Sequence, residues 1–432
     1  MPGKLKNNHF LAGTAVYLVS NILNAAIPFL LLPVLTRYLS TEEYGQVAMF
    51  QTLFGALTAF IGLSMQGAAG RKFYDGNLDE NSLREFIGSC LQILCVTSAV
   101  TMIVLVSLSG PLSGWMGLDR NWIFMAVLMT ACMSVVQIRL GQWQVRKQAK
   151  QFGAMQVSQG LLNVALSLIL VVVLVQGAGG RIVAQVWAAG LFGLLALWLL
   201  RRDDLLRFRV WRPDYIREAL SFGVPLIPHV GGIFLLSSVD RFVVNSHLGL
   251  SQTGIYMVAV QFAAALALVF DAINKAYVPW LFERLKRNRA DELRQIVRLT
   301  YAWYGVILCG GGLAFVVGPW LVIFVAGEQY AKAGDVIGWL ALGQVFGGMY
   351  LMVTNYIFYS KRTGLLSVVT IMAGLLNVAL LYALIGHFGL EGAAYAFCIA
   401  MAVRFFLSWW VAQRRHAMPW FEFGTLFSGT GR

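Results

Sequence analysis

Long apolar segments recur along the whole chain and restrict the folds that it can adopt. We count twelve such segments in 432 residues. Each is about 20 residues or longer, the length that an α-helix needs to cross roughly 30 Å of hydrocarbon. Strands of a membrane barrel need only about 10 residues of alternating polarity, so these segments predict helices. The expected spans are 11–36, 44–68, 86–108, 121–141, 154–176, 182–200, 219–246, 253–279, 298–325, 334–358, 365–386 and 390–412.

The composition agrees with an all-α polytopic membrane protein. Hydrophobic residues make up 58% of the chain and charged residues only 12%, which leaves too little polar surface for a water-soluble protein of this length. The connections are short, so the spans themselves are expected to carry the function. The five cysteines lack metal-ligand spacing, and the chain has no phosphate-cradling loop. We therefore expect free thiols, no metal, no cofactor and no enzymatic activity.

The basic residues are distributed unevenly between the two sides of the membrane. Most of the 33 Lys and Arg residues fall in connections on the same side as the N-terminus, including "RRDDLLRFRVWR" and "ERLKRNR". The opposite connections hold only Arg37, Arg120, Arg181 and Lys332. Positively charged connections stay in the cytoplasm, so both termini are predicted to be cytoplasmic. Topology and attraction to anionic lipid explain the net charge of +13 without a nucleic-acid partner.

An internal repeat divides the chain near its middle. The motif "GLLNVAL" occurs at 160–166 and again at 374–380. The segment "YLSTEEYGQVAMFQ" around Gly45 aligns with "HLGLSQTGIYMVAV" around Gly254, and "GGRIVAQVWA" is similar to "GLEGAAYAFC". All three offsets lie between 209 and 214 residues.

These matches align spans 1 and 2 with spans 7 and 8, and spans 5 and 6 with spans 11 and 12. An even number of crossings separates the copies, so the halves share one orientation, as in a parallel repeat about an axis along the membrane normal. We expect two six-helix lobes related by a pseudo-two-fold axis, residues 1–212 and residues 213–432.

Several segments resemble those of a known transporter family. They are "SNILNAAIPFLLLPVLTRYLSTEEYGQVAMFQ" near the start, and "VDRFVVNSHLGLSQTGIYMVAVQF" and "AYVPWLFERL" in the second half. The chain resembles the Wzx-type polysaccharide or O-antigen flippases of the multidrug/oligosaccharidyl-lipid/polysaccharide (MOP) exporter superfamily over essentially its whole length.

That resemblance implies a function. It implies a bacterial inner-membrane flippase that moves an undecaprenyl-pyrophosphate-linked oligosaccharide from the cytoplasmic to the periplasmic leaflet by alternating access. It also implies energy from a proton or sodium gradient rather than a cofactor. The implied partners are the lipid-linked glycan, membrane lipid and the polysaccharide polymerase machinery.

Three alternatives remain. A multidrug or cation antiporter of the same superfamily shares the fold, but is expected to have an acidic, aromatic cavity. A peptidoglycan-precursor flippase is expected to add two further spans. A membrane polysaccharide polymerase or ligase needs a large external loop with catalytic groups.

Charged residues inside spans are candidates for the substrate site, because each costs about 2.5 to 3.5 kcal/mol on insertion scales. Arg404 has no acidic residue three or four positions away on its helix. It is expected either to bind substrate phosphate in a cavity or to extend to the cytoplasmic interface.

Asp240 and Arg241 are adjacent, and neighbours on a helix point about 100° apart, so they do not pair on one helix face. Each is expected to find another helix or to line a cavity that meets phosphate or sugar. Asp271 and Lys275 are four residues apart and can pair on one face. The pair is either structural or contains an ion-coupling carboxylate.

Uncharged polar residues and prolines give weaker signals. Asn21 and Asn24 are candidates for the sugar route, although hydrogen bonds between helices explain them equally simply. Arg71 and Lys72 lie where a pyrophosphate would enter, or anchor the span at the interface. Further polar candidates are Ser20, Gln51, Asn163 and Asn377.

The prolines of spans 1 and 7, at positions 28, 33, 225 and 228, predict interrupted, moving helices in both halves.

Overall fold

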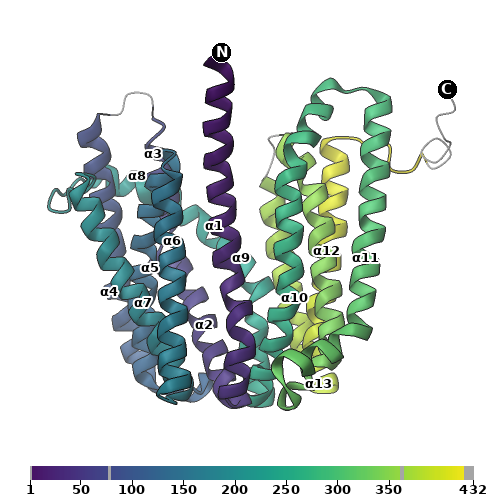
Figure 1. The fold of residues 1–432 in the computed structure, drawn as a ribbon, viewed down its shortest axis with the longest axis horizontal. Helices are drawn as coiled ribbons and strands as arrows, with labels where there is room; N and C mark the ends of the chain where they lie inside the picture. The colour runs from purple at the N-terminus through teal and green to yellow at the C-terminus, as the bar shows by residue number, and fades with distance from the viewer. Residues whose placement is uncertain (1, 76–78, 361–363, 423–432) are drawn as a thin grey trace. The chain divides into compact units, whose positions relative to one another are not determined.

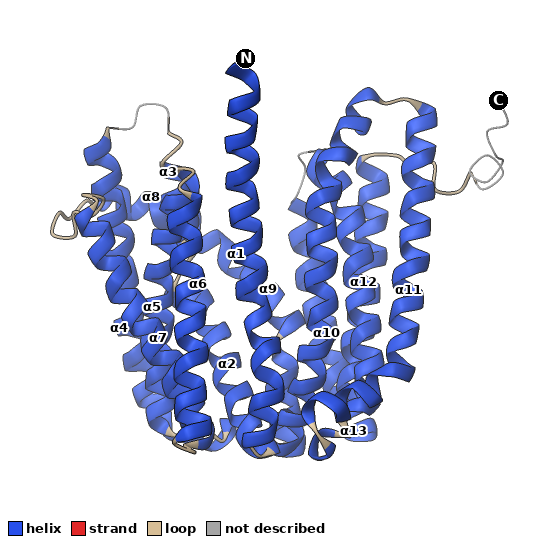
Figure 2. Ribbon diagram, in the orientation of Figure 1, coloured by secondary structure: helices blue, strands red, loops and turns tan. Residues whose placement is uncertain are grey.

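The structure, a computed structural model, describes residues 2–75, 79–360 and 364–422. Within these ranges every regular element is a helix (Figures 1 and 2). The helices form two compact units, Met1–Gly231 and Gly232–Arg432. The lobe boundary expected after residue 212 stays a prediction. All five cysteines are free thiols, as expected.

The first unit contains six long helices and several short ones among its described residues. Its elements are α1 (Pro2–Tyr38), α2 (Thr41–Ile61), α3 (Met65–Lys72), α4 (Glu80–Met116), α5 (Arg120–Val145), α6 (Ala149–Ser167), the π-helix η1 (Leu168–Val173), α7 (Gly177–Arg202), α8 (Pro213–Gly223) and the 3-10 helix η2 (Val224–Leu226). Helix α5 packs against α2, α3, α4, α6 and α7.

The boundary between the units runs through α9 (Ile227–Ser237). The second unit continues with α10 (Val239–Arg287), α11 (Ala290–Ala326), the 3-10 helix η3 (Glu328–Tyr330), α12 (Ala333–Tyr359) and α13 (Gly364–Arg415). Helix α12 packs against α10, α11 and α13.

The number of membrane-spanning helices is close to the prediction. Ten described helices are long and apolar enough to cross a membrane, or eleven if the bent pair α2 and α3 counts as one span. Helix α13 has 52 residues, about 78 Å at 1.5 Å per residue, which is more than twice the thickness of the hydrocarbon. Its backbone is non-helical at Gly389 (φ 56°, ψ −130°), which divides it into two spans.

Gly249 makes a similar break in α10, with φ 83° and ψ 175°. Residues before this break continue the span that begins in α8, and residues after it form the next span. Both glycines occupy the positive-φ region that other residues adopt only with strain. Counted with these breaks, the described helices accommodate about twelve spans.

The interruption predicted from the prolines is present in span 7 and absent from span 1, and the movement of these helices stays a prediction. Span 7 is interrupted at η2 and again at Ser238, whose backbone leaves the helical region. Helix α1 instead runs continuously through Pro28 and Pro33. The α1 prolines therefore do not divide their span.

Glycines allow close helix packing in each unit. In the first, a Cβ on Gly160 of α6 would lie 2.2 Å from Ile27 Cδ1 of α1. In the second, a Cβ on Gly374 of α13 would lie 2.9 Å from the carbonyl oxygen of Gly232 in α9. Small residues let helix backbones approach within a membrane, where packing replaces the hydrophobic effect as the driving force. Asn377 strengthens the second contact by donating to the carbonyl oxygen of Leu235 at 3.0 Å.

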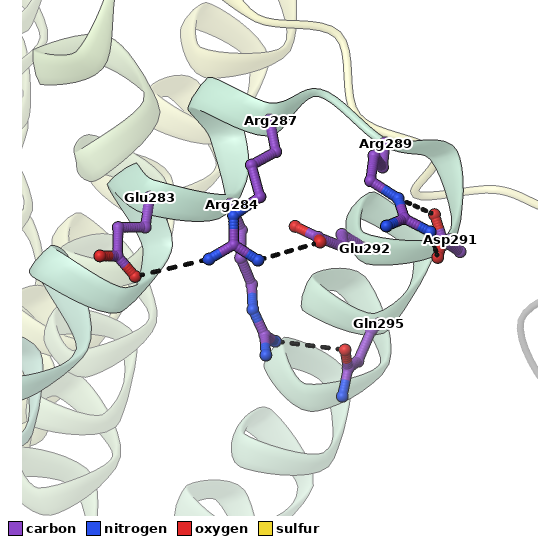
Figure 3. Close-up of polar contacts among 7 residues, drawn as sticks. All are labelled: Glu283, Arg284, Arg287, Arg289, Asp291, Glu292 and Gln295. Carbon is purple, nitrogen blue, oxygen red and sulfur yellow. Dashed lines mark hydrogen bonds and ion pairs between the residues drawn. The ribbon is translucent and has the colours of Figure 1, made fainter.

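The basic connection between α10 and α11 is largely neutralised by its own acids (Figure 3). Arg287 pairs with Glu283 at 3.7 Å and with Glu292 at 3.2 Å, and Arg289 pairs with Asp291 at 3.0 Å. Exposed ion pairs of this kind contribute little stability. Ion pairs with Glu283 and with Asp291 and Glu292 of α11 therefore balance much of the positive charge of the "ERLKRNR" segment.

Candidate functional site

Two cavities of the first unit are lined by amide side chains and by no charged residue, and we call them the amide cavities. The larger has a volume of about 440 Å³ and the smaller about 150 Å³. Both are lined by Met133 and Gln137 of α5. The polar residues that line the larger are Thr58, Ser64, Gln66, Thr130, Ser134 and Gln137, and those that line the smaller are Asn24, Gln137, Gln156, Gln159, Asn163 and Gln185.

Four helices supply the amides of the smaller cavity. Asn24 comes from α1, Gln137 from α5, Gln159 from α6 and Gln185 from α7. Within the described chain, the buried Oε1 atoms of Gln156 and Gln185 accept no hydrogen bond. Buried acceptors normally have a donor, so these two oxygens suit a ligand that brings hydroxyl groups.

The charge of the amide cavities limits what they can hold. Their lining residues include no Asp, Glu, Lys or Arg and a single aromatic residue, Phe54. A site for an organic cation or a coupling ion would be expected to present a carboxylate or an aromatic face. Amide groups instead offer both donors and acceptors, as sugar hydroxyls require.

Arg181 is a buried cation, whereas the charge distribution in the sequence predicts that it lies in an outer connection. Its side chain lies in the second turn of α7 and is 4% exposed. NH1 donates to Asn163 Oδ1 at 2.8 Å and to the Ser167 hydroxyl, directly before the π-helix η1. Among the described residues, no carboxylate lies within ion-pairing distance of it. Arg181 therefore positions Asn163, which lines the smaller amide cavity.

Asp240 and Arg241 find different partners, as expected for neighbours on a helix. Asp240 is 2% exposed and accepts a hydrogen bond from the Tyr256 hydroxyl at 2.8 Å. Its other oxygen accepts from the backbone N–H of Arg241 at 2.9 Å. The Arg241 guanidinium donates to the carbonyl oxygen of Ser237 at 3.1 Å. The carboxylate is held within its own unit, and a cavity role for this pair stays a prediction.

Arg404 meets an aromatic ring. Its guanidinium carbon lies 3.7 Å from the centroid of the Tyr350 ring, which α12 presents to α13. This cation–π contact stabilises a charge away from bulk water. The contact neither requires nor excludes phosphate binding, so that role also stays a prediction.

Asp271 and Lys275 form the predicted pair on one face of α10. Lys275 Nζ lies 2.6 Å from Asp271 Oδ2, and both side chains are about half exposed. The neighbouring Asn274 accepts a hydrogen bond from Asn355 at 2.8 Å. The ion pair exists, and whether it couples transport to an ion is a separate proposal.

The remaining candidates of the first unit do not gather at one place. Asn24 lines the smaller amide cavity, while Asn21 accepts a hydrogen bond from Gln156 at 3.1 Å. Lys72 pairs with Glu218 at 2.9 Å and with Asp75 at 3.2 Å, so its charge is already balanced. Arg71 is exposed beside the ring of Phe222, 5.9 Å from its centroid. Lys72 thus joins α3 to α8.

Comparisons with known proteins give a consistent picture. The sequence model of the family described as "Polysaccharide biosynthesis protein" matches residues 10–285. Lsg locus putative protein 1 of Haemophilus influenzae is 23% identical over 86% of this chain and 90% of its own length. The probable low-salt glycan biosynthesis flippase Agl15 of Haloferax volcanii is 21% identical over 89% of this chain and 79% of its own.

A solved structure shares the fold. The lipid II flippase MurJ, in an inward closed conformation, superposes with a TM-score of 0.73 over 93% of this chain and 87% of its own. The two sequences are 14% identical, so the likeness concerns the fold alone.

Proposed function

We propose that this chain, which belongs to the polysaccharide biosynthesis protein family, is a flippase for a lipid-linked oligosaccharide. Its cargo would be an undecaprenyl-pyrophosphate-linked repeat unit, moved from the cytoplasmic to the periplasmic leaflet of a bacterial inner membrane by alternating access. The product would feed a surface polysaccharide such as O-antigen or capsule. In this proposal the chain is a carrier and not an enzyme, and a polysaccharide polymerase uses what it delivers.

The observation that carries the proposal is the chemistry of the amide cavities. Their linings carry no charge and combine apolar with polar side chains, and in the smaller cavity Gln156 and Gln185 present buried oxygens that accept no hydrogen bond within the described chain. Sugars bring many hydroxyl donors and no charge, so they match this lining. The pyrophosphate would need cations, for which Arg241 and Arg404 of the second unit are the proposed candidates.

The expected parallel repeat is part of the proposal. Gly160 and Gly374 are equivalent letters of the repeated motif, and each packs at close range on the first span of its own half. Alternating access by two similar lobes would follow from such a repeat.

A multidrug or cation antiporter is the second candidate function. It would need an acidic or aromatic lining, whereas the linings of both amide cavities lack Asp and Glu. The cavity chemistry therefore favours the glycan cargo over an organic cation.

Reconstitution of the full chain into liposomes tests the proposal directly. A fluorescent undecaprenyl-pyrophosphate oligosaccharide is added, and flipping is followed by the fraction of label that a membrane-impermeant reductant reaches. Gln137→Leu removes the amide shared by both cavities and should slow flipping about fivefold, the value of one hydrogen bond of about 1 kcal/mol. Leu194→Ala is the control, because Leu194 is 67% exposed on α7 and lines neither cavity.

The opposite result is equally clear. If liposomes with the wild-type protein transport a cationic dye and do not flip the labelled glycan, the flippase proposal is wrong and the antiporter function is favoured.

A further inference from the structure

A third cavity of the first unit lies where α5 and α7 end and α6 begins. It has a volume of about 480 Å³, and we call it the arginine pocket. Three arginines line it, Arg139, Arg146 and Arg202, together with one carboxylate, Asp203. None of these residues lines either amide cavity. The arginine pocket is thus separate from the site proposed for the sugars.

Arg139 forms the buried wall of this pocket. Its side chain is only 1% exposed, and its guanidinium carbon lies 4.2 Å from the centroid of the Trp143 ring. NH2 donates to Asp203, whereas Nε and NH1 have no hydrogen-bond partner among the described residues. A buried donor without an acceptor costs about 1 to 3 kcal/mol, and more when it is charged. Two such donors on one guanidinium call for an acceptor from outside the part of the chain that the structure describes.

The charge and shape of the arginine pocket indicate what that acceptor is. The lining contains three arginines and one carboxylate, so it carries an excess of positive charge, unlike the balanced cluster of Figure 3. Gln148 and Gln151, at the start of α6, add a helix N-terminus that favours an anion. Leu199 and Leu205 give the pocket an apolar side. A planar guanidinium pairs best with a carboxylate or a phosphate.

We propose that the arginine pocket binds a phosphate group, and that its source is the headgroup of an anionic phospholipid. The pocket lies at the end of the helices that also carries Lys147, Lys150 and Arg201, the end that the charge distribution predicts to be cytoplasmic. Basic pockets between transmembrane helices at that surface are suited to acidic headgroups. The bound phosphate would satisfy Arg139 and tie the ends of α5, α6 and α7 together.

A matched pair of variants tests this proposal. Arg202→Gln removes a charge from the pocket, and Arg201→Gln removes the neighbouring charge, which does not line it. Both residues are exposed, so neither change should impair folding. The measurement is native mass spectrometry of the detergent-purified full chain titrated with phosphatidylglycerol, with phosphatidylcholine as the zwitterionic control. We expect the apparent affinity for the first phosphatidylglycerol to fall about fivefold more in Arg202→Gln than in Arg201→Gln.

Arg139→Gln is the stronger test, with its thermal unfolding measured first to establish that it folds. It should lose more phosphatidylglycerol affinity than Arg202→Gln, because it removes the buried donors. If it fails to fold, the Arg202 and Arg201 pair still decides the outcome.

Inorganic phosphate, added at constant ionic strength, distinguishes the two sources of the group. Displacement of phosphatidylglycerol by inorganic phosphate in wild type but not in Arg202→Gln would assign the pocket to a soluble phosphate. Lipid binding that resists inorganic phosphate and depends on Arg202 would assign it to the headgroup. Equal phosphatidylglycerol affinity in wild type, Arg202→Gln and Arg201→Gln would overturn the proposal.

Discussion

Asp240 shows how a carboxylate is accommodated inside an apolar helix bundle. Both of its oxygens are occupied, one by the Tyr256 hydroxyl and the other by the backbone N–H of Arg241. A buried charge is costly unless hydrogen bonds replace its water. The tyrosine hydroxyl and the backbone N–H therefore replace part of the hydration that the carboxylate loses on burial.

Removing that hydroxyl should destabilise the second unit. Tyr256→Phe deletes the donor to Asp240 without changing the ring, and hydrogen bonds to charged groups contribute about 1.5 to 3 kcal/mol. We expect a lower midpoint of thermal unfolding for the purified protein. Tyr382→Phe is the control, because Tyr382 is exposed and its loss should change stability by no more than about 0.5 kcal/mol. Equal midpoints for the two variants would contradict this account.

Sequence reasoning identified the charged residues inside spans but not their partners. Asp240 and Arg404 were recognised from their apolar surroundings, whereas the tyrosines that contact them carry no distinguishing signal in the sequence. Arg181 lies near the end of a span, so the charge distribution assigns it to an outer connection, and Arg139 near the end of its span likewise carries no sequence signal of burial. Their burial depends on how far the helices extend and how they rotate, which hydropathy does not specify.

The two glycine breaks determine where the long helices of the second unit change course. Gly249 and Gly389 both have positive φ, and neither would meet another atom within 4 Å if a Cβ were added. Backbone conformation, not crowding, is thus the reason that a glycine stands at each position.

A substitution at Gly389 should be destabilising through strain alone. Gly389→Ala forces an L-residue into the positive-φ region, at a cost of about 1 to 3 kcal/mol. Gly386→Ala is the matched control, since Gly386 lies three residues earlier in α13, has no positive φ and also has open space around it. There alanine should stabilise the helix by about 1 kcal/mol. Opposite shifts of the unfolding midpoint are expected, and shifts of the same sign would refute the strain argument.

The elements were the best-predicted level of this protein. Apolar segment lengths gave about twelve spans because membrane thickness fixes the length of a spanning helix. The breaks at Gly249 and Gly389 fall in the gaps expected between spans 219–246 and 253–279 and between spans 365–386 and 390–412. The prolines misled the prediction for α1, since neighbouring helices in a bundle can support a proline within a continuous helix.

At the level of the whole transporter, the chain belongs to the family that the sequence resembled, and its fold is that of a flippase of known structure. How transport is driven is open to a direct test at Asp271. Its pair with Lys275 is half exposed, so Asp271→Asn should change stability by less than about 1 kcal/mol. A loss of transport in Asp271→Asn would therefore reflect a role of Asp271 in transport and not a loss of folded protein.

In liposomes with an imposed proton or sodium gradient, Asp271→Asn should reduce gradient-driven flipping to the rate seen without a gradient. Glu283→Gln is the control, because Glu283 is an exposed carboxylate of the same helix. If Asp271→Asn flips the glycan at the wild-type rate when a gradient is imposed, the Asp271–Lys275 pair has only a structural role.

The hydrogen bond between Tyr256 and Asp240 also bears on how the chain is made. The two residues lie sixteen positions apart, on opposite sides of the break at Gly249. While the ribosome has delivered only the first of these two helices, the acid has no hydroxyl to meet it and opposes entry into lipid by about 2.5 to 3.5 kcal/mol. Synthesis of the next helix supplies the donor, so the two are expected to leave the insertion machinery together, as a hairpin in which a hydrogen bond already replaces part of the hydration of the acid.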